Sequence, residues 1–426
     1  MTVIDRCRLT FGQLSLWRSI EHFSLEQLSG ANLRQVWPLP DGVTVADVRG
    51  ALEALEERHE AMRTRYRLDP GAELEQLVWA PEPVALDVQE GGADATALAR
   101  QVSAELGDEL FDLAVDKPWR AKLITTAGRP ACLVVSVHHI TADGWSMLQL
   151  GTEFLDLVAG KDLGAPAPTC RELAEEQHSD AWANRRTAAV EHWRRVVAEA
   201  PEPPDELSAD ARTRWATLRS ASSLRDAQLL AGQVGIPLPT VVFAAYTEAL
   251  RARTGRDVHL VGLFAGNRLE PGWRTLVTSM NQLAPMIARC VEGEDLPAAA
   301  RRLHWESLRS LRHGVFDVDA VADAVREYGK DGVGGGFRYF YNFRDMAQAA
   351  IPAVIAGASA ESDWNVETSS SERNNQSPFY LRAHAGEELM LSLQESSSID
   401  DFEPVRRFVV TMAEELRDAA KAADAG

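Results

Sequence analysis

Two adjacent histidines followed by an aspartate and a glycine form the pattern in this sequence that is best suited to chemistry. His138 and His139 end an apolar run, and Asp143 and Gly144 follow shortly after. Histidine titrates near neutrality, so it can take up or release a proton during a reaction. Asp143 could bond a histidine nitrogen or an arginine, and Gly144 would let a backbone N–H approach a substrate carbonyl. The same residues would also suit two buried core histidines beside a capping aspartate.

The elements around the histidines are predicted to be strand, loop and helix. Residues 119–124 and 131–137 have the composition of two strands joined by a turn at 127–130. The helical pattern that begins after Gly144 runs to about Val158, with Ser146 as its expected N-cap. Neighbouring strand residues point to opposite faces, so the two histidines should meet different environments.

A second helix is predicted earlier in the chain, over residues 45–66. Its apolar positions, with His59 among them, recur at steps of three and four, and Thr44 with Asp47 has the spacing of an N-terminal cap. Arg63 would then lie one turn beyond His59. It could make a salt bridge at the surface or between lobes, or it could brace the loop that carries the histidines.

The length of the chain predicts two hydrophobic cores. It has 426 residues, which is long for one core. A proline-rich acidic stretch, 199–205, indicates a boundary. We therefore expect an N-terminal lobe over 1–180, a crossover helix and linker over 181–213, and a C-terminal lobe over 214–426. In the last of these, 240–252 is predicted to be a helix, and 258–264, 283–288 and 337–343 are predicted to be strands.

Composition and charge disfavour several classes of function. A net charge of −19 repels phosphate backbones and anionic lipid, so we expect no nucleic-acid or membrane partner. No apolar stretch reaches 18 residues and the N-terminus lacks a signal-peptide pattern, which favours a cytoplasmic protein. The four cysteines are far apart, so no metal site is expected. Arginine-rich stretches at 185–195 and 301–312 are interpreted as solvated helix faces, although either could dock a protein partner.

The complete string from His138 to Gly144, continued by Trp145 and Ser146, resembles a known family signature. It resembles His-His-x-x-x-Asp-Gly of the condensation domains of nonribosomal peptide synthetases, in the chloramphenicol acetyltransferase-like superfamily. Further segments resemble family motifs in the expected order, and they are residues 9–17, 58–64, 111–113, 265–268 and 280–281. Two late motifs depart from the family, one near 304–316 and one at 373–379.

The resemblance implies a fold and a set of site residues. The implied fold class is α+β, with two chloramphenicol acetyltransferase-like lobes in a V-shaped pseudo-dimer and the active site in a tunnel between them. His139 would be a general base or a positioning group, and His138 would support its loop. Asp143, with Gly144 beside it in the motif, would pair with Arg268 and so join the two halves. The implied supporting residues are Arg268, Arg63, Trp145 and Asn281, with Trp145 in a packing role.

The implied function is that of a free-standing condensation enzyme of natural-product biosynthesis. It would move an acyl or aminoacyl group from a phosphopantetheine thioester to an amine or hydroxyl, forming an amide or an ester. No cofactor or metal would be bound, because a peptidyl or acyl carrier protein would present the substrate in trans. The acceptor would be a small molecule or carrier-bound. Two alternatives stay open: an acyl-CoA-dependent acyltransferase of the same superfamily, and a catalytically silent recruitment module. Epimerisation fits the end of the motif less well.

Overall fold

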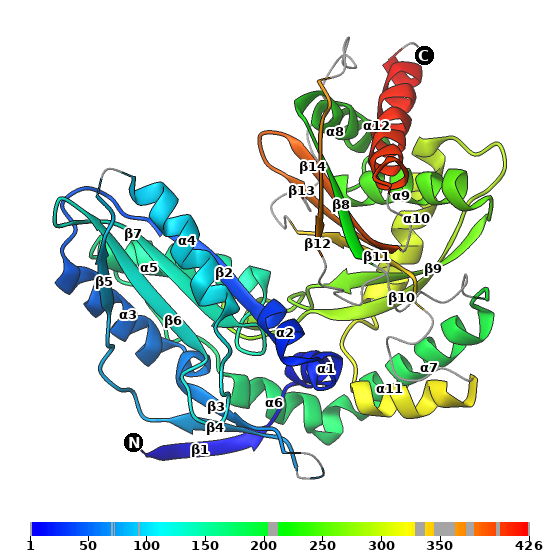
Figure 1. Cartoon of the computed structure of the whole chain (residues 1–426). Helices are drawn as coiled ribbons and strands as arrows, with labels where there is room; N and C mark the ends of the chain where they lie inside the picture. The colour runs from blue at the N-terminus through cyan, green and yellow to red at the C-terminus, as the bar shows by residue number, and fades with distance from the viewer. Residues whose placement is uncertain are drawn as a thin grey trace. The chain divides into compact units, whose positions relative to one another are not determined.

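The computed structural model of the chain consists of two compact units (Figure 1). It describes residues 2–69, 71, 73–92, 94–202, 212–328, 337–344, 363–371, 379–397 and 401–424. Unit 1 comprises Met1–Thr187, Gly266–Gln282 and Val315–Val318, and unit 2 comprises Ala188–Ala265, Leu283–Gly314 and Asp319–Gly426.

Two short segments from the second half of the chain belong to unit 1, which differs from the single lobe expected over 214–426. Leu276, Val277 and Met280 are buried in the hydrophobic core of unit 1, and this burial holds Gly266–Gln282 there. The predicted crossover region contains helix α7 (Ala183–Glu199), while 203–211 of the predicted linker and most of the 373–379 motif lie outside the described residues.

The described residues of unit 1 that precede α7 form two sheets and five helices of eight or more residues. In chain order its elements are β1 (Val3–Arg8), α1 (Phe11–Ile20), α2 (Leu25–Leu28), η1 (Ser29–Ala31), β2 (Asn32–Pro38), α3 (Val45–Arg58), η2 (Glu60–Arg63), β3 (Thr64–Arg67), β4 (Glu75–Trp79), β5 (Asp87–Glu90), α4 (Ala95–Asp108), β6 (Trp119–Thr126), β7 (Arg129–His138), α5 (Gly144–Val158), α6 (Cys170–His178), η3 (Asp180–Trp182) and η4 (Pro271–Trp273). The strand orders are β1-β4-β3 and β2-β7-β6-β5.

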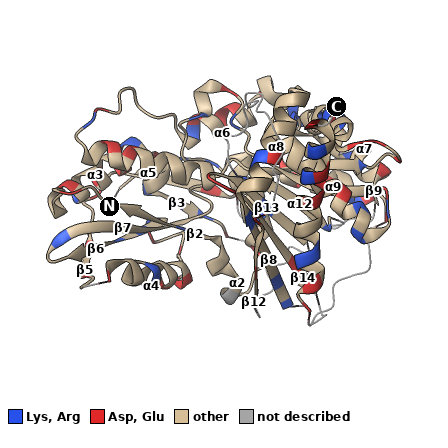
Figure 2. Cartoon of the chain, turned by 90° about the horizontal axis from the view of Figure 1, so that it is seen from above, with Lys and Arg blue, Asp and Glu red and all other residues tan. Residues whose placement is uncertain are grey.

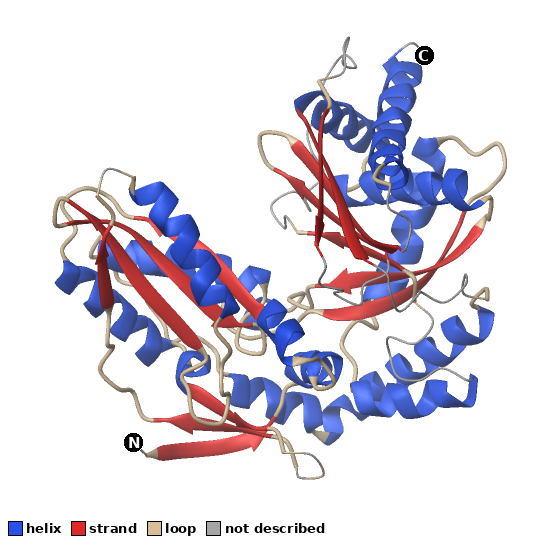
Figure 3. Cartoon of the chain, viewed as in Figure 1, coloured by secondary structure: helices blue, strands red, loops and turns tan. Residues whose placement is uncertain are grey.

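Helices cover both faces of the four-stranded sheet of unit 1 (Figure 3). Cys132 and Val134 of β7 pack with α4, whereas Leu133, Val135 and Val137 pack with α3 and α5. Because successive side chains alternate between the faces, a strand covered on both sides is largely apolar, as β7 is apart from buried residues such as Ser136. The predicted strands at 119–124 and 131–137 are therefore confirmed as β6 and β7, joined by a turn in which Ala127 and Gly128 have positive φ.

Unit 2 is built on one seven-stranded sheet among the described residues. Its elements are β8 (Arg212–Ser220), α8 (Ala221–Val234), α9 (Leu238–Thr254), β9 (Val258–Ala265), β10 (Gln282–Arg289), α10 (Leu296–Leu311), α11 (Val318–Val325), η5 (Arg326–Tyr328), β11 (Tyr339–Phe343), β12 (Asn365–Ser371), β13 (Phe379–Ala385), β14 (Leu389–Ser397) and α12 (Glu403–Asp424). The strand order is β10-β9-β11-β13-β14-β8-β12.

One face of this sheet packs against α8, α9, α10 and α12 in a single hydrophobic core. Strand β11 pairs parallel with β9 and β13, while β13, β14, β8 and β12 pair antiparallel in turn. The predicted helix at 240–252 and the predicted strands at 258–264, 283–288 and 337–343 correspond to α9, β9, β10 and β11. Figure 2 shows acidic and basic residues interspersed along helices such as α3 and α4.

The helix predicted over 45–66 is shorter than expected. Helix α3 begins after the Thr44 cap as predicted but ends at Arg58, and His59 has an extended backbone. Residues 60–63 then form the 3-10 turn η2, and Thr64–Arg67 pair with β4. The spacing of Met62 and Tyr66 suits a helix, but the hydrogen bonds of the β3–β4 ladder determine the backbone here. Arg63 is thus not on the amphipathic helix.

Helix α1 starts against the segment of unit 1 that contains Ser279 and Met280. A Cβ added to Gly12 would clash with the carbonyl oxygen of Ser279 and lie 2.8 Å from the Cα of Met280. Both neighbours are backbone atoms, so neither can move aside cheaply. Gly12 is therefore required for this close approach.

We predict that Gly12→Ala destabilises unit 1 by about 1–3 kcal/mol through overpacking. Gly50→Ala is the matched control, because Gly50 is an exposed residue of α3 with no atom near its added Cβ. There alanine should stabilise the helix by up to about 1 kcal/mol. Urea unfolding of the two variants measures both effects, and equal shifts of the same sign would refute the close-packing argument.

In the described part of the chain, no individual helix is both long and apolar enough for a membrane crossing. Helices α8 and α9 meet such a criterion only as a pair bent by 110°.

Candidate functional site

His138 is the last residue of β7 and is buried. Its side chain is 5% exposed, and its ring meets that of Phe111 edge-on at 6.1 Å. Its Nδ1 accepts a hydrogen bond from the backbone N–H of Ile140 at 3.2 Å. Burial, with the nearby ring of His139, lowers the pKa of His138 to about 3. The ring is therefore neutral at pH 7 and supports the turn that follows the strand.

His139 is the first residue beyond β7 and is half-buried. Its backbone N–H donates to the carbonyl oxygen of Ala31 at 2.7 Å, which fixes the backbone next to the start of β2. The backbone of Thr141 in turn donates to the carbonyl oxygen of His138 at 2.9 Å. The doublet thus has one buried member and one that reaches solvent, as strand alternation predicts.

Asp143 caps helix α5, and Gly144 is the first residue of that helix. The Asp143 carboxylate accepts a hydrogen bond from the backbone N–H of Ser146 at 2.9 Å. The prediction that Ser146 is the N-cap is wrong: the helix begins earlier than expected, so Asp143 is the N-cap and Ser146 is the third helical residue, whose N–H the cap satisfies. Ser146 instead donates through its hydroxyl to the carbonyl oxygen of Thr278 at 2.9 Å.

The predicted contact between Asp143 and Arg268 is present. Arg268 Nη1 lies 2.6 Å from Asp143 Oδ2, and the two side chains are 2% and 4% exposed. Burial by itself would raise the pKa of Asp143, but the charge and hydrogen bonds of Arg268, with the N–H groups of Ser146 and Met280, hold that pKa below its usual value. Asp143 is therefore a carboxylate at neutral pH.

Arg268 also bonds to the segment that follows it. Its Nη2 donates to the hydroxyl of Ser146 at 2.9 Å and to the carbonyl oxygen of Thr278 at 3.0 Å. Asp143 and Arg268 both belong to unit 1. The expectation that this pair joins two halves is corrected accordingly: the pair fastens the segment 266–282 to the start of α5 within one unit.

Two further predicted residues, Trp145 and Asn281, are held by hydrogen bonds that involve the segment 266–282. Trp145 donates from Nε1 to the carbonyl oxygen of Arg274 at 2.8 Å, so its indole is anchored by packing and a hydrogen bond. Asn281 accepts from the hydroxyl of Ser279 at 3.3 Å. Both side chains are half-buried.

Arg63 does not contact the motif among the described interactions. Its guanidinium donates to the carbonyl oxygens of Glu56 and Trp79, at 3.2 and 2.8 Å, and lies 3.7 Å from the Glu60 carboxylate. It therefore ties the end of η2 to α3 and β4. Among the described residues, the predicted brace on the histidine loop is absent.

Sequence reasoning missed a buried carboxylate on α5. Glu153 accepts hydrogen bonds from His59 at 2.5 Å and from Gln149 at 2.7 Å, and Arg58 lies 3.3 Å away. Burial would raise the pKa of Glu153, but the bonds from His59 and the charge of Arg58 hold it below its usual value. The available signal was the adjacent Arg58 and His59, since both side chains can hydrogen-bond to a carboxylate. This network fixes α5 to the end of α3.

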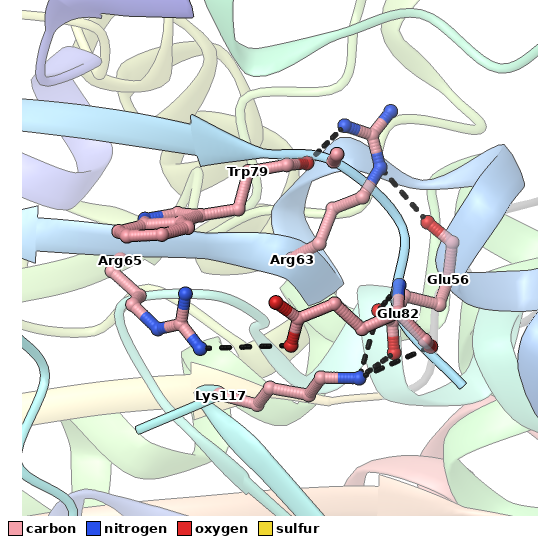
Figure 4. A pocket seen from close by; sticks show the side chains of 7 residues that line it. Glu56, Arg63, Arg65, Trp79, Glu82 and Lys117 are labelled. Atoms are coloured by element: carbon pink, nitrogen blue, oxygen red, sulfur yellow. Dashed lines mark hydrogen bonds and ion pairs between the residues drawn. The ribbon is translucent and has the colours of Figure 1, made fainter. Parts of the chain in front are cut away.

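A small hollow elsewhere in unit 1 is lined mainly by charged residues, several of which pair with one another (Figure 4). Lys117 Nζ lies 2.7 Å from Glu56, and Arg65 stacks on the Trp79 ring at 4.3 Å and faces Glu82. No residue from His138 to Gly144 lines it. The hollow is a packed ion-pair cluster and not part of the candidate site.

No group of three or more His, Cys, Asp or Glu side chains within the described ranges is placed to hold a metal ion. The motif itself presents a half-buried imidazole, that of His139, beside a loop and helix start held by the Asp143–Arg268 pair.

A comparison with known families identifies the family of the chain. The condensation-domain family model matches residues 20–424, nearly the whole chain, so the chain belongs to the condensation-domain family. Members of this family have the two-lobed chloramphenicol acetyltransferase-like fold, and the mixed α+β architecture seen here matches theirs. The resemblance that the motif implied is confirmed, and so is the α+β fold class with two chloramphenicol acetyltransferase-like lobes.

Individual relatives lie at low sequence identity. The chain is 27% identical over 345 residues to the AMB antimetabolite synthetase AmbB of Pseudomonas aeruginosa, covering 76% of this chain but 26% of that protein. The chain thus spans only a small part of this curated relative. In structure it is similar to SgcC5 from Streptomyces globisporus (TM-score 0.74, 20% identity, 98% and 99% of the two chains). It is equally similar to an X-domain in complex with OxyB from teicoplanin biosynthesis (TM-score 0.73, 18% identity, 100% and 95%).

Proposed function

We propose that this chain is a condensation enzyme of natural-product biosynthesis. It transfers an acyl or aminoacyl group from the phosphopantetheine thioester of a carrier protein to an amine or hydroxyl. The observation that carries the proposal is the complete motif, in which His138 is buried and neutral, Asp143 is paired with Arg268, and His139 alone of the three is half-buried. We also propose that the protein is cytoplasmic, as expected from the sequence.

The reaction needs one bond to form and one to break. The acceptor nitrogen or oxygen attacks the thioester carbonyl carbon, the carbon–sulfur bond breaks, and the acceptor proton ends on the departing sulfur. His139 either takes that proton as a general base or holds the acceptor in position. A positioned base contributes about 10²–10⁴-fold to the rate. Asp143 and His138 act through the loop and do not contact the reacting atoms in this scheme.

Two alternatives give different results with different donors. An acyl-CoA-dependent acyltransferase would use coenzyme A thioesters, and a recruitment module would bind a partner without transfer. The chain resembles the X-domain and SgcC5 in fold to nearly the same degree. The fold therefore does not distinguish the proposed enzyme from the two alternatives. The intact motif favours catalysis.

The test is a donor comparison read by mass spectrometry. Acyl groups are supplied on holo-carrier proteins, on coenzyme A and on pantetheine, each with a panel of amines and alcohols. We expect amide or ester product from the carrier-bound donor. Product from coenzyme A thioesters alone would replace the proposal by the second function, and partner binding without product from any donor would replace it by the third.

A further inference from the structure

The two histidines of the motif lie at the start of a tight turn. The backbone N–H of Thr141 donates to the carbonyl oxygen of His138 at 2.9 Å, which is the hydrogen bond of a four-residue β-turn. His139 and Ile140 are the central residues of this turn, and His139 carries the half-buried ring. The direction of that ring therefore depends on how firmly the turn is held at both ends.

The first end of the turn is held by the backbone of strand β7. His138 pairs with Asn32 of β2, and the N–H of His139 donates to the carbonyl oxygen of Ala31 at 2.7 Å. These backbone contacts do not depend on the side chains involved. They fix where the turn begins but not where it closes.

The second end of the turn is held by a side chain from the other sheet of unit 1. The Thr141 side chain is fully buried, and its hydroxyl oxygen lies 3.1 Å from the phenol oxygen of Tyr66, with which it shares a hydrogen bond. Tyr66 belongs to β3 and is 1% exposed. Ile140 and the Tyr66 ring are also part of the same small apolar cluster. Tyr66 therefore fastens the residue that closes the turn.

Tyr66 is itself held firmly. Its backbone N–H donates to the carbonyl oxygen of Leu113 at 2.8 Å, and the residue pairs with Gln76 in the β3–β4 ladder. Burial raises the pKa of the Tyr66 phenol well above its ordinary value, while the hydrogen bond with Thr141 acts in the opposite direction. The phenol is therefore neutral at pH 7 and keeps its proton.

We propose that Tyr66 is a positioning residue, which orients the His139 ring by fastening Thr141. This inference rests on the proposed function, in which His139 contacts the reacting groups. Thr141 occupies one of the three unspecified positions of His-His-x-x-x-Asp-Gly, so the anchor is a feature of this chain and not of the signature. A group that takes part in a reaction must be held within about 0.5 Å of its productive position, and the Tyr66–Thr141 bond restricts the turn on that scale.

The kinetic test removes one oxygen of the pair at a time. Tyr66→Phe and Thr141→Val each break the hydrogen bond and nearly keep the shape of the side chain. With a carrier-bound donor, each should lower kcat about tenfold, which is less than the loss of the imidazole itself, and leave KM within about twofold of the wild type. Because both substitutions delete the same bond, the double variant should be no slower than the slower single variant. Multiplication of the two effects, or a change in KM alone, would overturn the positioning role.

Tyr246→Phe is the matched control in unit 2. Tyr246 is also fully buried, and its phenol donates to the carbonyl oxygen of Phe340 at 3.4 Å. Tyr66→Phe and Tyr246→Phe should each lower the urea midpoint slightly, but only Tyr66→Phe should slow the reaction. An equal loss of kcat in Tyr246→Phe would reduce the effect to general stability and would also overturn the positioning role.

Hydrogen–deuterium exchange separates this inference from the proposed function. The N–H groups of Ile140 and Thr141 report on the turn, because they donate to the ring and to the carbonyl oxygen of His138. Their exchange should be about tenfold faster in Tyr66→Phe and unchanged in Tyr246→Phe. Faster exchange in a chain that transfers no acyl group from any donor would support the anchored turn and refute the proposed function alone. A wild-type kcat in both Tyr66→Phe and Thr141→Val would overturn the inference and leave the proposed function intact.

Discussion

Replacing Asp143 by alanine is expected to lower the stability of unit 1 by about 3–5 kcal/mol, because it leaves the buried Arg268 guanidinium without its carboxylate. Three hydrogen-bond donors lose an acceptor at once: Arg268, the N–H of Ser146 and the N–H of Met280. The start of α5 and the segment 276–282 should then open together. Activity should fall as a consequence of this opening.

The comparison is with a solvent-exposed ion pair of the same unit. Arg185 and Glu270 are 2.8 Å apart but 58% and 48% exposed, so Glu270→Ala, which leaves the stacking of Arg185 on Trp182 in place, should cost at most about 1 kcal/mol. Hydrogen–deuterium exchange is the appropriate measurement, because a chain with two units need not unfold in one step. It should show faster exchange at the start of α5 in Asp143→Ala only.

The sign of the pH dependence follows from the lowered pKa of Asp143. A carboxyl group whose pKa is depressed by folding contributes stability above its unfolded pKa and loses it as the pH falls through the folded value. The difference in unfolding free energy between the wild type and Asp143→Ala should therefore have its full value at neutral pH and decrease as the pH is lowered. An Asp143→Ala protein with native exchange and no activity would contradict the bracing role and assign Asp143 a direct part in the reaction.

His139→Ala is expected to reduce kcat by about 10²–10⁴-fold while leaving the fold intact. The side chain is half-buried, so its removal leaves less of a cavity than the loss of a core residue. The dissociation constant for the carrier should not change. Residual activity is expected, since binding and orientation of the two substrates persist without the imidazole.

Two other histidines provide the controls. His138→Ala should act mainly on stability, because it deletes a buried ring in contact with Phe111 and an acceptor for the Ile140 N–H. His22→Ala should change neither property, because that side chain is 86% exposed. A kcat for His139→Ala within about threefold of the wild type would remove His139 from the mechanism.

Local patterns in the sequence were sufficient to predict the strand, loop and helix that carry the motif. An apolar run as continuous as 131–137 favours a buried strand, and the helical spacing beyond Gly144 predicts α5, although the N-cap expected at Ser146 lies three residues later than the one observed. The spacing of His59, Met62 and Tyr66 was misleading in comparison. Steps of three and four also occur by chance where a short turn leads into a strand, and only the pairing of β3 with β4 decides between the two.

The long-range part of the site depends on contacts that no local pattern encodes. Arg268 is 125 residues from Asp143, and its pairing was inferred through family resemblance. The burial of Leu276 and Met280 in the core of unit 1 could not be predicted from composition, since both residues would suit either core. Glu153 was missed because a single carboxylate in a helix is ordinarily solvated, and only its neighbours His59 and Arg58 make it a buried one.

The central claim is that the wild-type chain forms an amide or ester from a carrier-bound thioester. The most direct measurement is the intact mass of an acyl-loaded carrier, and of the acceptor mixture, before and after incubation with the protein. The account predicts that the carrier loses the mass of the acyl group and that one acceptor gains it, with the loss of one hydrogen from the acceptor. An unchanged carrier across the full panel of donors and acceptors, or release of the acyl group only as the free acid, would contradict it.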